Sequence, residues 1–220
     1  MSGNLQLYSY WRSSAAFRVR IALNLKGLAY ETLPVHLLRD GGEQHSADYR
    51  QINPQQLVPV LRHGDRLLRQ SLAILEYLEE TWPQPPLLPA DSRGRARVRG
   101  IANAIACDVH PLNNLRVLQY LERECEMGQD ERDAWVRHWI SEGFQAIEAM
   151  LGDHPSTGRF SEGDVPTMAD CCIVPQVYNA RRFGVDISAF PAIEQIERAC
   201  LALPAFDAAR PEKQPDSPSV

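Results

Sequence analysis

The chain has 220 residues, of which 44% are hydrophobic and 23% are charged, a balance typical of a folded protein with an apolar core. This length suits one large domain or two small ones. The formal net charge of −5 disfavours nucleic acids and anionic membrane surfaces as partners. No apolar stretch approaches the roughly 20 residues of a membrane-spanning helix, so we expect no membrane partner.

The five cysteines are odd in number, widely scattered and without a C-x-x-C motif. This pattern favours reduced thiols over a disulfide framework, and it predicts no metal site. Residues 1–4 lack a basic segment followed by an apolar run, so we expect no secretory signal. The expected location is therefore the cytoplasm.

Strand-like and helix-like segments alternate in the first part of the chain. Leu5–Tyr10 has the alternating polarity of a strand. Residues 13–27 carry apolar side chains near helical spacing and close on Lys-Gly, so they predict a helix that begins at a serine pair. A second strand is predicted at residues 30–36. Strand, helix and strand form a βαβ unit, whose two strands we expect to be parallel.

A hairpin and a further helix are predicted next. Residues 58–61 and 66–69 are strand-like and flank a turn that contains Gly and Asp. Residues 72–80 have the apolar spacing of an amphipathic helix, for which Ser71 is the expected N-cap.

The proline-rich segment 82–89 cannot continue a helix and favours a stiff connector, so the domain boundary is placed there. The expected domains are residues 1–84, with an α/β fold, and residues 91–220, which are expected to be all-helical because strand signals nearly vanish. The alternate arginines between 93 and 99 are expected to face solvent, and the tail after Pro204 to be poorly ordered at its end. Helices are predicted at residues 93–126 (as one or two), at 130–151 and 191–203, and after a capping box at 167–170.

Three places in the first domain offer hydrogen-bonding groups to a ligand. Ser13 and Ser14 stand at a helix start, where free N–H groups and the helix dipole favour an anion or thiolate. A cis bond at Val58-Pro59 would turn backbone groups outward to pair with a peptide. Gln70 and Ser71 offer donors to a carboxylate. Taken singly, each place is better explained by an ordinary N-cap or a trans edge proline. Together they match the thiol, peptide and carboxylate groups of glutathione.

The order of these motifs resembles that of the glutathione transferases. Within that family, Y-S-Y-W-R-S-S followed by R-V-R-I-A-L is similar to the zeta class, which contains maleylacetoacetate isomerases and bacterial maleylpyruvate isomerases. The resemblance covers nearly the whole chain. Its motifs are residues 8–14 and 18–23, N-P-x-x-x-V-P at 53–59, Q-S at 70–71 and E-Y-L-E-E at 76–80, with later matches at 108–114, 163–170, 174–177 and 179–183.

The resemblance implies a thioredoxin-like domain followed by an all-helical domain, glutathione as cofactor, and a homodimer. The implied reaction is cis–trans isomerisation of a small dianionic diketo acid, maleylacetoacetate or maleylpyruvate, in aromatic compound catabolism. An alternative is a glutathione S-transferase or dehalogenase that acts on small electrophiles. A binding module without activity and a glutaredoxin-like oxidoreductase are further alternatives that the residues disfavour.

The resemblance also implies roles for individual residues. Ser13 is implied to face the glutathione sulfur, with Ser14 and Arg12 as further catalytic residues. The family usually has cysteine after the two serines, whereas Ala15 stands here, which counts against redox chemistry by a protein thiol at this place. The implied glutathione-binding residues are Gln44, Val58, Gln70, Ser71 and His110, with Asp108 and Asn114 reaching glutathione in the other subunit. The implied ligands of the substrate carboxylates are Arg12, Arg116 and Arg182.

Overall fold

The computed structural model describes residues 4–152 and 154–218. The chain divides into two compact units. One contains the residues up to Leu87 together with those from Leu203 onward, and the other runs from Leu88 to Ala202. Within the described ranges, no helix has both the length and the apolar character needed to cross a membrane.

A four-stranded sheet forms the centre of the first unit, with the strand order β2-β1-β3-β4. β1 pairs with β2 in parallel, and β3 pairs with both β1 and β4 in antiparallel orientation. The predicted βαβ unit and hairpin are therefore confirmed. The strands are β1 (Leu5–Ser9), β2 (Glu31–Pro34), β3 (Val60–His63) and β4 (Arg66–Arg69).

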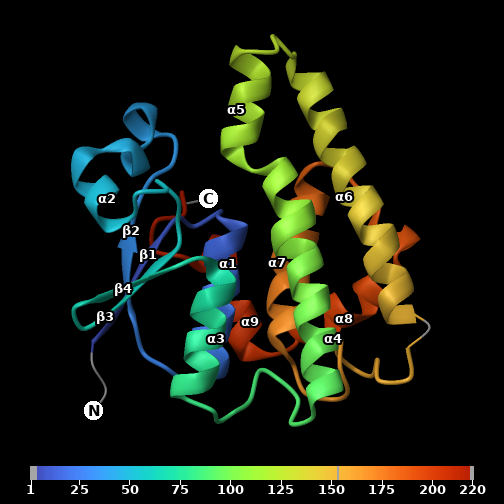
Figure 1. The fold of residues 1–220 in the computed structure, drawn as a ribbon. Coiled ribbons are helices and arrows are strands. Elements are labelled where there is room, and N and C mark those ends of the chain that lie inside the picture. Colours follow the sequence, from blue (N-terminus) through green and yellow to red (C-terminus); the bar gives the residue numbers. More distant parts are fainter. Residues whose placement is uncertain (1–3, 153, 219–220) are drawn as a thin grey trace. The chain divides into compact units, whose positions relative to one another are not determined.

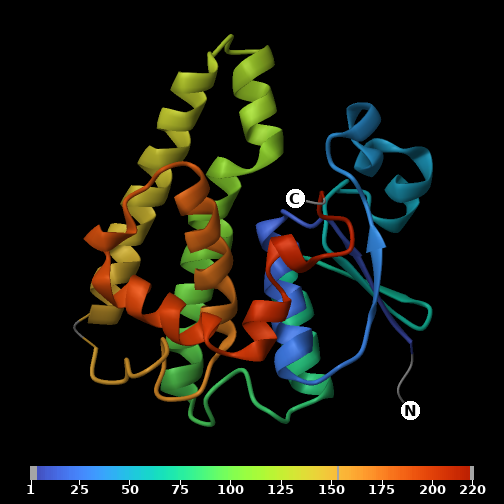
Figure 2. The same ribbon diagram turned by 180° about the vertical axis from the view of Figure 1, so that it is seen from behind.

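Two helices cover one face of this sheet. α1 (Ser14–Leu25) and α3 (Ser71–Thr81) lie side by side, and the short α2 (Ala47–Ile52) lies on the opposite face (Figure 1, Figure 2). Val19 of α1 and Ile74 of α3 are fully buried, as is expected for the apolar stripes of amphipathic helices.

The C-terminal segment belongs to the first unit, whereas the sequence predicts it to be part of the helical domain. Its helix α9 (Pro204–Ala208) packs against α1. Asn24 and Arg20 of α1 each donate a hydrogen bond to a main-chain carbonyl of this segment, at 2.9 and 3.0 Å. The N–H of Trp11 donates to a carboxylate oxygen of Asp216 at 2.8 Å. These contacts tie the described part of the tail to the first unit, whereas residues 219–220, at the end for which poor order is predicted, lie outside the described residues.

The regular elements of the second unit are all helical within its described residues. α4 packs against α7, and α8 packs against both α6 and α7. The predicted segment 93–126 forms two helices, which a π-helical turn at Ala104–Val109 and a 3-10 turn at His110–Asn113 separate. The helices are α4 (Ser92–Asn103), α5 (Leu115–Arg123), α6 (Gln129–Gly152), α7 (Met168–Arg182) and α8 (Pro191–Leu201).

Polar side chains hold the loop between α6 and α7. Thr167 and Asp170 form the predicted capping box at the start of α7. Arg97 departs from the predicted solvent-facing orientation: it donates to the Thr157 hydroxyl at 2.7 Å, to the Met150 carbonyl at 3.1 Å, and it pairs with a carboxylate of the same loop. At least one arginine of the alternating run therefore contacts the protein instead of facing solvent.

Candidate functional site

Four segments meet at one end of the sheet in the first unit. Tyr8 of β1 pairs with Val60, the first residue of β3, and Val60 pairs with Arg69, the last residue of β4. Ser9, the last residue of β1, pairs with Pro34, the last residue of β2. The segments that follow β1, β2 and β4, and the one that precedes β3, therefore start at the same edge. They carry the predicted site residues Arg12, Ser13, Ser14, Gln44, Val58, Gln70 and Ser71.

Ser13 is the N-cap of α1, as the sequence predicts. Its hydroxyl accepts a hydrogen bond from the N–H of Ala16 at 3.2 Å and keeps its own proton for a second partner. Ser14 is buried, Ser13 is half-buried, and no acidic residue lies in the first turn. The guanidinium of Arg12 lies over the ring of Trp11, 5.3 Å from its centre. The helix start therefore presents a hydroxyl and a positive electrostatic environment.

Ser71 is the first residue of α3, and its prediction as the N-cap is wrong. Gln70 occupies the cap position with a φ of 71° and makes no side-chain cap hydrogen bond; its amide instead donates to Gln55 at 2.8 Å. The Ser71 hydroxyl accepts a hydrogen bond from Nη1 of Arg18 at 3.1 Å. The start of α3 is thus a helix N-terminus without a side-chain cap, which is a favourable place for an anion.

Gln44 is held in the loop between β2 and α2, where its side chain is only 5% exposed. Its Nε2 donates to the carbonyl of Leu37 at 3.3 Å and lies 3.1 Å from Nε2 of His45. Within the described part of the chain, its Oε1 is buried and has no hydrogen-bond partner. A buried acceptor in this condition is uncommon and suits a ligand donor.

Val58 precedes β3, and its bond to Pro59 is cis. The carbonyl of the preceding residue, Leu57, accepts hydrogen bonds from Asn53 at 2.7 Å and from the Tyr49 hydroxyl at 2.8 Å. Burial raises the pKa of Tyr49, so its hydroxyl stays protonated and remains a donor. The backbone before β3 is therefore fixed by two side chains.

The remaining predicted residues belong to the helical unit. Asp108 is exposed on the π-helical turn, and Arg116 is exposed on α5. Asn114 is the N-cap of α5, and its Nδ2 lies 3.4 Å from Nε2 of His110. Arg182 is in the last turn of α7, with its guanidinium 4.8 Å from the ring centre of Phe183. Within this unit, the structure brings His110 and Asn114 together.

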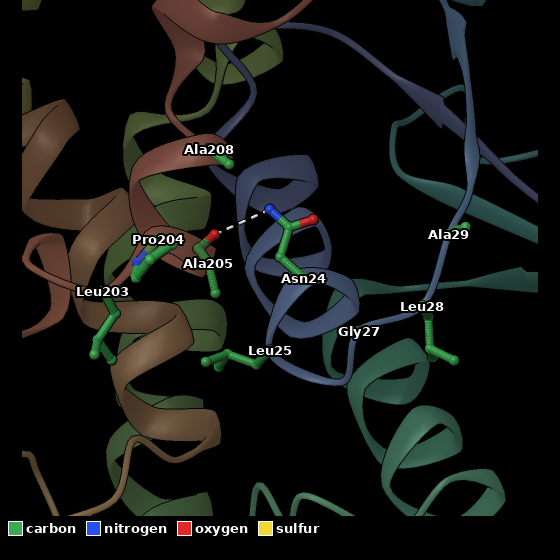
Figure 3. Close-up of a pocket in the computed structure, with 9 residues that line it drawn as sticks. All are labelled: Asn24, Leu25, Gly27, Leu28, Ala29, Leu203, Pro204, Ala205 and Ala208. Carbon is green, nitrogen blue, oxygen red and sulfur yellow. Dashed lines mark hydrogen bonds between the residues drawn. The ribbon is translucent and has the colours of Figure 1, made fainter.

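A pocket of about 650 Å³ lies at the other end of α1 from Ser13 (Figure 3). Most of its lining is apolar, and the amide of Asn24 is bonded to the carbonyl of Ala205 beside it. None of the residues predicted for the site lines this pocket. Its lining residues are Asn24, Leu25, Gly27, Leu28, Ala29, Leu203, Pro204, Ala205 and Ala208.

Comparison with known proteins shows the family of this chain. Residues 7–86 match the family model described as the glutathione S-transferase N-terminal domain. A probable maleylacetoacetate isomerase of Vibrio cholerae is 51% identical over 97% of this chain and 99% of its own. A solved structure of maleylpyruvate isomerase, described as a bacterial glutathione S-transferase of the zeta class, is 50% identical with a TM-score of 0.94, over 97% of this chain and 100% of its own.

The chain belongs to the zeta class of glutathione transferases. A further member of known structure, maleylacetoacetate isomerase of Anaeromyxobacter dehalogenans, is 48% identical with a TM-score of 0.87 over 99% of both chains, and it holds glutathione in its active site. The predicted fold, a thioredoxin-like domain with an all-helical domain, is confirmed by these relatives and by the sheet and helices described above.

The sequence of this zeta-class chain did not single out two further residues near the site, Arg18 and Gly42. Arg18 contacts Ser71 across 53 positions of sequence, so its partner is visible only in the fold. Gly42 has a φ of 105°, and a Cβ at this position would lie 2.5 Å from Nε2 of Gln44. The Gly-Gly pair signals a turn, but it does not show which side chain needs the space.

Proposed function

We propose that this protein is a glutathione-dependent cis–trans isomerase of a small dicarboxylic diketo acid. The reaction is the conversion of maleylacetoacetate to fumarylacetoacetate or of maleylpyruvate to fumarylpyruvate. The observation that carries the proposal is about half identity, over nearly full length, to relatives named for these reactions. Ser13 at the N-cap of α1 supports it, because that place suits a reactive thiol.

Glutathione fits the groups present at the sheet end of the first unit. It is a tripeptide with an amine, two peptide links, a thiol and two carboxylates. The partnerless Oε1 of Gln44 suits an N–H donor, and the backbone of Val58 suits an extended peptide. The uncapped start of α3, with Gln70 and Ser71, suits a carboxylate.

Bound glutathione supplies a nucleophilic sulfur for addition to the conjugated double bond. An ordinary thiol has a pKa of about 8.5, so it needs activation near neutral pH. We assign this activation to the Ser13 hydroxyl, as a hydrogen-bond donor, and to the first N–H groups of α1 beside Ser14. Both favour the anionic form of the sulfur and lower its pKa.

The substrate carries two carboxylates, and we assign them to arginines. Arg12 directly precedes the N-cap serine, whereas Arg116 and Arg182 come from the helical unit. A guanidinium matches a carboxylate with two parallel hydrogen bonds. The neighbouring Arg181 pairs with Glu197, with 2.6 Å between Nη2 and a carboxylate oxygen, so Arg181 is not assigned to the substrate.

Further roles follow from membership of the class. We propose that His110 borders the glutathione site and that Asp108 and Asn114 reach glutathione in the second subunit of a homodimer. We place the enzyme in the cytoplasm, in the catabolism of aromatic compounds. The residue roles rest on the motifs at residues 108–114, the pathway on the named reactions of the relatives, and the location on the cysteine pattern that favours reduced thiols.

The test is an isomerisation assay with maleylacetoacetate and maleylpyruvate in parallel, with and without glutathione. Ser13→Ala is expected to lower kcat about ten- to a hundredfold, because a hydrogen bond to a charged sulfur is lost. Asp91→Ala is the control, because Asp91 is an exposed N-cap in the helical unit, with hydrogen bonds to the N–H groups of Arg93 and Gly94. It is expected to keep full activity.

The faster of the two substrates names the preferred reaction. Glutathione-dependent turnover by the wild type, with collapse in Ser13→Ala alone, supports the isomerase. Absence of turnover of both acids by a protein that still binds glutathione contradicts it and favours a transferase that conjugates glutathione to electrophiles.

A further inference from the structure

Arg18 is a buried cation at the glutathione end of α1. Its side chain is 2% exposed, although arginine is among the residue types least often buried. Its Nη1 donates to the hydroxyl of Ser71 at 3.1 Å, and Ser71 is itself only 6% exposed. This hydrogen bond connects the first turns of α1 with the first residue of α3 inside one unit.

The chemistry of this hydrogen bond orients the Ser71 hydroxyl. A hydroxyl has one proton and two lone pairs, and a guanidinium can only donate. The Arg18 N–H therefore occupies a lone pair of Ser71 Oγ, and the serine proton must point to a different acceptor. Among the described residues, no acceptor for that proton is found. An acceptor atom of a ligand bound at the start of α3 would receive this proton in a hydrogen bond.

The surroundings select an anionic acceptor. The start of α3 has free N–H groups and no side-chain cap, because Gln70 bonds to Gln55 instead. A guanidinium that is shielded from water contributes a stronger positive potential there than an exposed cation would. Arg20, the other buried arginine of α1, is directed elsewhere, to the Ser9 hydroxyl and to main-chain carbonyls.

We propose that Arg18 is a positioning residue that orients the Ser71 hydroxyl toward the α-carboxylate of the γ-glutamyl residue of glutathione. The inference rests on the proposed function, because it needs glutathione at this end of the sheet. Arg18 acts through Ser71 and through its charge, without contact with the reacting sulfur.

The test compares the affinities of two ligands by calorimetry. One is glutathione, and the other is 4-aminobutyryl-cysteinyl-glycine, which lacks only the γ-glutamyl α-carboxylate. The Kd of this analogue divided by the Kd of glutathione is the Kd ratio, and it measures the contribution of that carboxylate. Arg18→Met is expected to lower this ratio about tenfold, the effect of losing one charge-assisted hydrogen bond. Arg18→Lys, which keeps the charge and a donor, is expected to restore part of it.

Lys26→Met is the matched control. Lys26, the C-cap of α1, is also a buried cation that bonds to α3, but its Nζ lies 2.9 Å from a carboxylate oxygen of Glu79, toward the other end of both helices. The control is expected to lower stability and leave the Kd ratio unchanged. The Ser71→Ala variant removes the hydroxyl itself and is expected to lower the ratio as Arg18→Met does. The double variant should then add little to either single change, because the two residues act as one unit.

An unchanged ratio in Arg18→Met overturns the inference, and so does a ratio that falls equally in Lys26→Met. If Arg18→Met does not fold, Ser71→Ala decides. An unchanged Kd ratio in Ser71→Ala would show that the hydroxyl through which Arg18 is proposed to act does not bind the carboxylate, and would overturn the inference. If the wild type binds neither ligand, the proposed function itself is contradicted. If the wild type binds glutathione but the Kd ratio does not respond to Arg18→Met, only the role of Arg18 is contradicted.

Discussion

At the scale of single residues, Gly42 controls the place of the Gln44 amide. Its φ of 105° is unfavourable for other residues, and a Cβ there would meet the Gln44 side chain at 2.5–2.8 Å. Gly42→Ala is therefore expected to displace the amide and to weaken glutathione binding about tenfold, the effect of losing one hydrogen bond from a ligand N–H group. Calorimetric titration with glutathione measures the change.

The neighbouring Gly41 provides the control for Gly42→Ala. Its φ is 81°, and a Cβ there would meet nothing within 4 Å. Gly41→Ala therefore carries a similar backbone penalty without the collision with Gln44. Both variants are expected to lose stability, and equal losses of glutathione affinity in the two would contradict the role given to Gly42.

Single-residue prediction from sequence succeeds where the cause is local. The cap role of Ser13 was predictable because an N-cap and its partner, Ala16, are neighbours along the chain. The cap role of Ser71 was not, because Gln70 takes an unusual positive φ and Ser71 is bonded to the distant Arg18. Local propensity cannot report a backbone conformation or a partner that tertiary packing selects.

At the scale of elements, close packing against α6 accompanies the break between α4 and α5. Gly143 of α6 approaches the π-helical turn so closely that a Cβ would lie 2.1 Å from Cγ2 of Val109. Gly143→Ala is expected to destabilise the protein by about 1–3 kcal/mol through overpacking, although Ala is the better helix former. Denaturant unfolding measures the free energy of unfolding.

Two variants make the Gly143 experiment specific. Gly100 of α4 has nothing within 4 Å of its Cβ position, so Gly100→Ala is expected to stabilise by up to about 1 kcal/mol. Adding Val109→Ala to Gly143→Ala removes the colliding methyl groups and is expected to recover part of the loss. A stabilising effect of Gly143→Ala equal to that of Gly100→Ala would contradict this prediction, because it would mean that α6 and the π-helical turn can move apart without loss of stability.

Most helices and strands were predictable because the spacing of apolar residues in the sequence differs between the two kinds of element. For residues 93–126 the sequence predicted one helix or two and did not locate the break. The spacing of apolar residues alone does not show where α6 contacts the π-helical turn. The same limit applies to Arg97, whose partners in the loop before α7 are brought to it by the packing of α4 against α7.

At the scale of the whole molecule, the C-terminal segment shows what composition cannot reveal. The tail is rich in proline and polar residues, which is typical of poor order. Its order comes from contacts with the first strand–helix turn, including Trp11 with Asp216 across 205 positions. Such contacts join chain ends that no sequence window contains, so the boundary at the proline-rich segment was predictable and the return of the chain was not.

Phe206 tests whether this return stabilises the first unit. It is fully buried on α9, which packs against α1. Phe206→Ala is expected to cost about 3–5 kcal/mol through loss of burial and a remaining cavity. Because α9 is part of the first unit, the amide protons of α1 are expected to exchange at least about a hundredfold faster, the rate equivalent of that free energy. Native-state hydrogen exchange measures α1 and α6 in the same sample.

The comparison between α1 and α6 separates a local effect from a global one. Amides near the centre of α6, such as that of Phe144, are expected to change less than those of α1, since α6 belongs to the other unit. Lys213→Ala removes an exposed ion pair with Asp207 in the same segment and is expected to leave the exchange rates of both helices nearly unchanged. Faster exchange in α6 than in α1 after Phe206→Ala would mean that the segment stabilises the helical unit, as the domain boundaries predicted from sequence require.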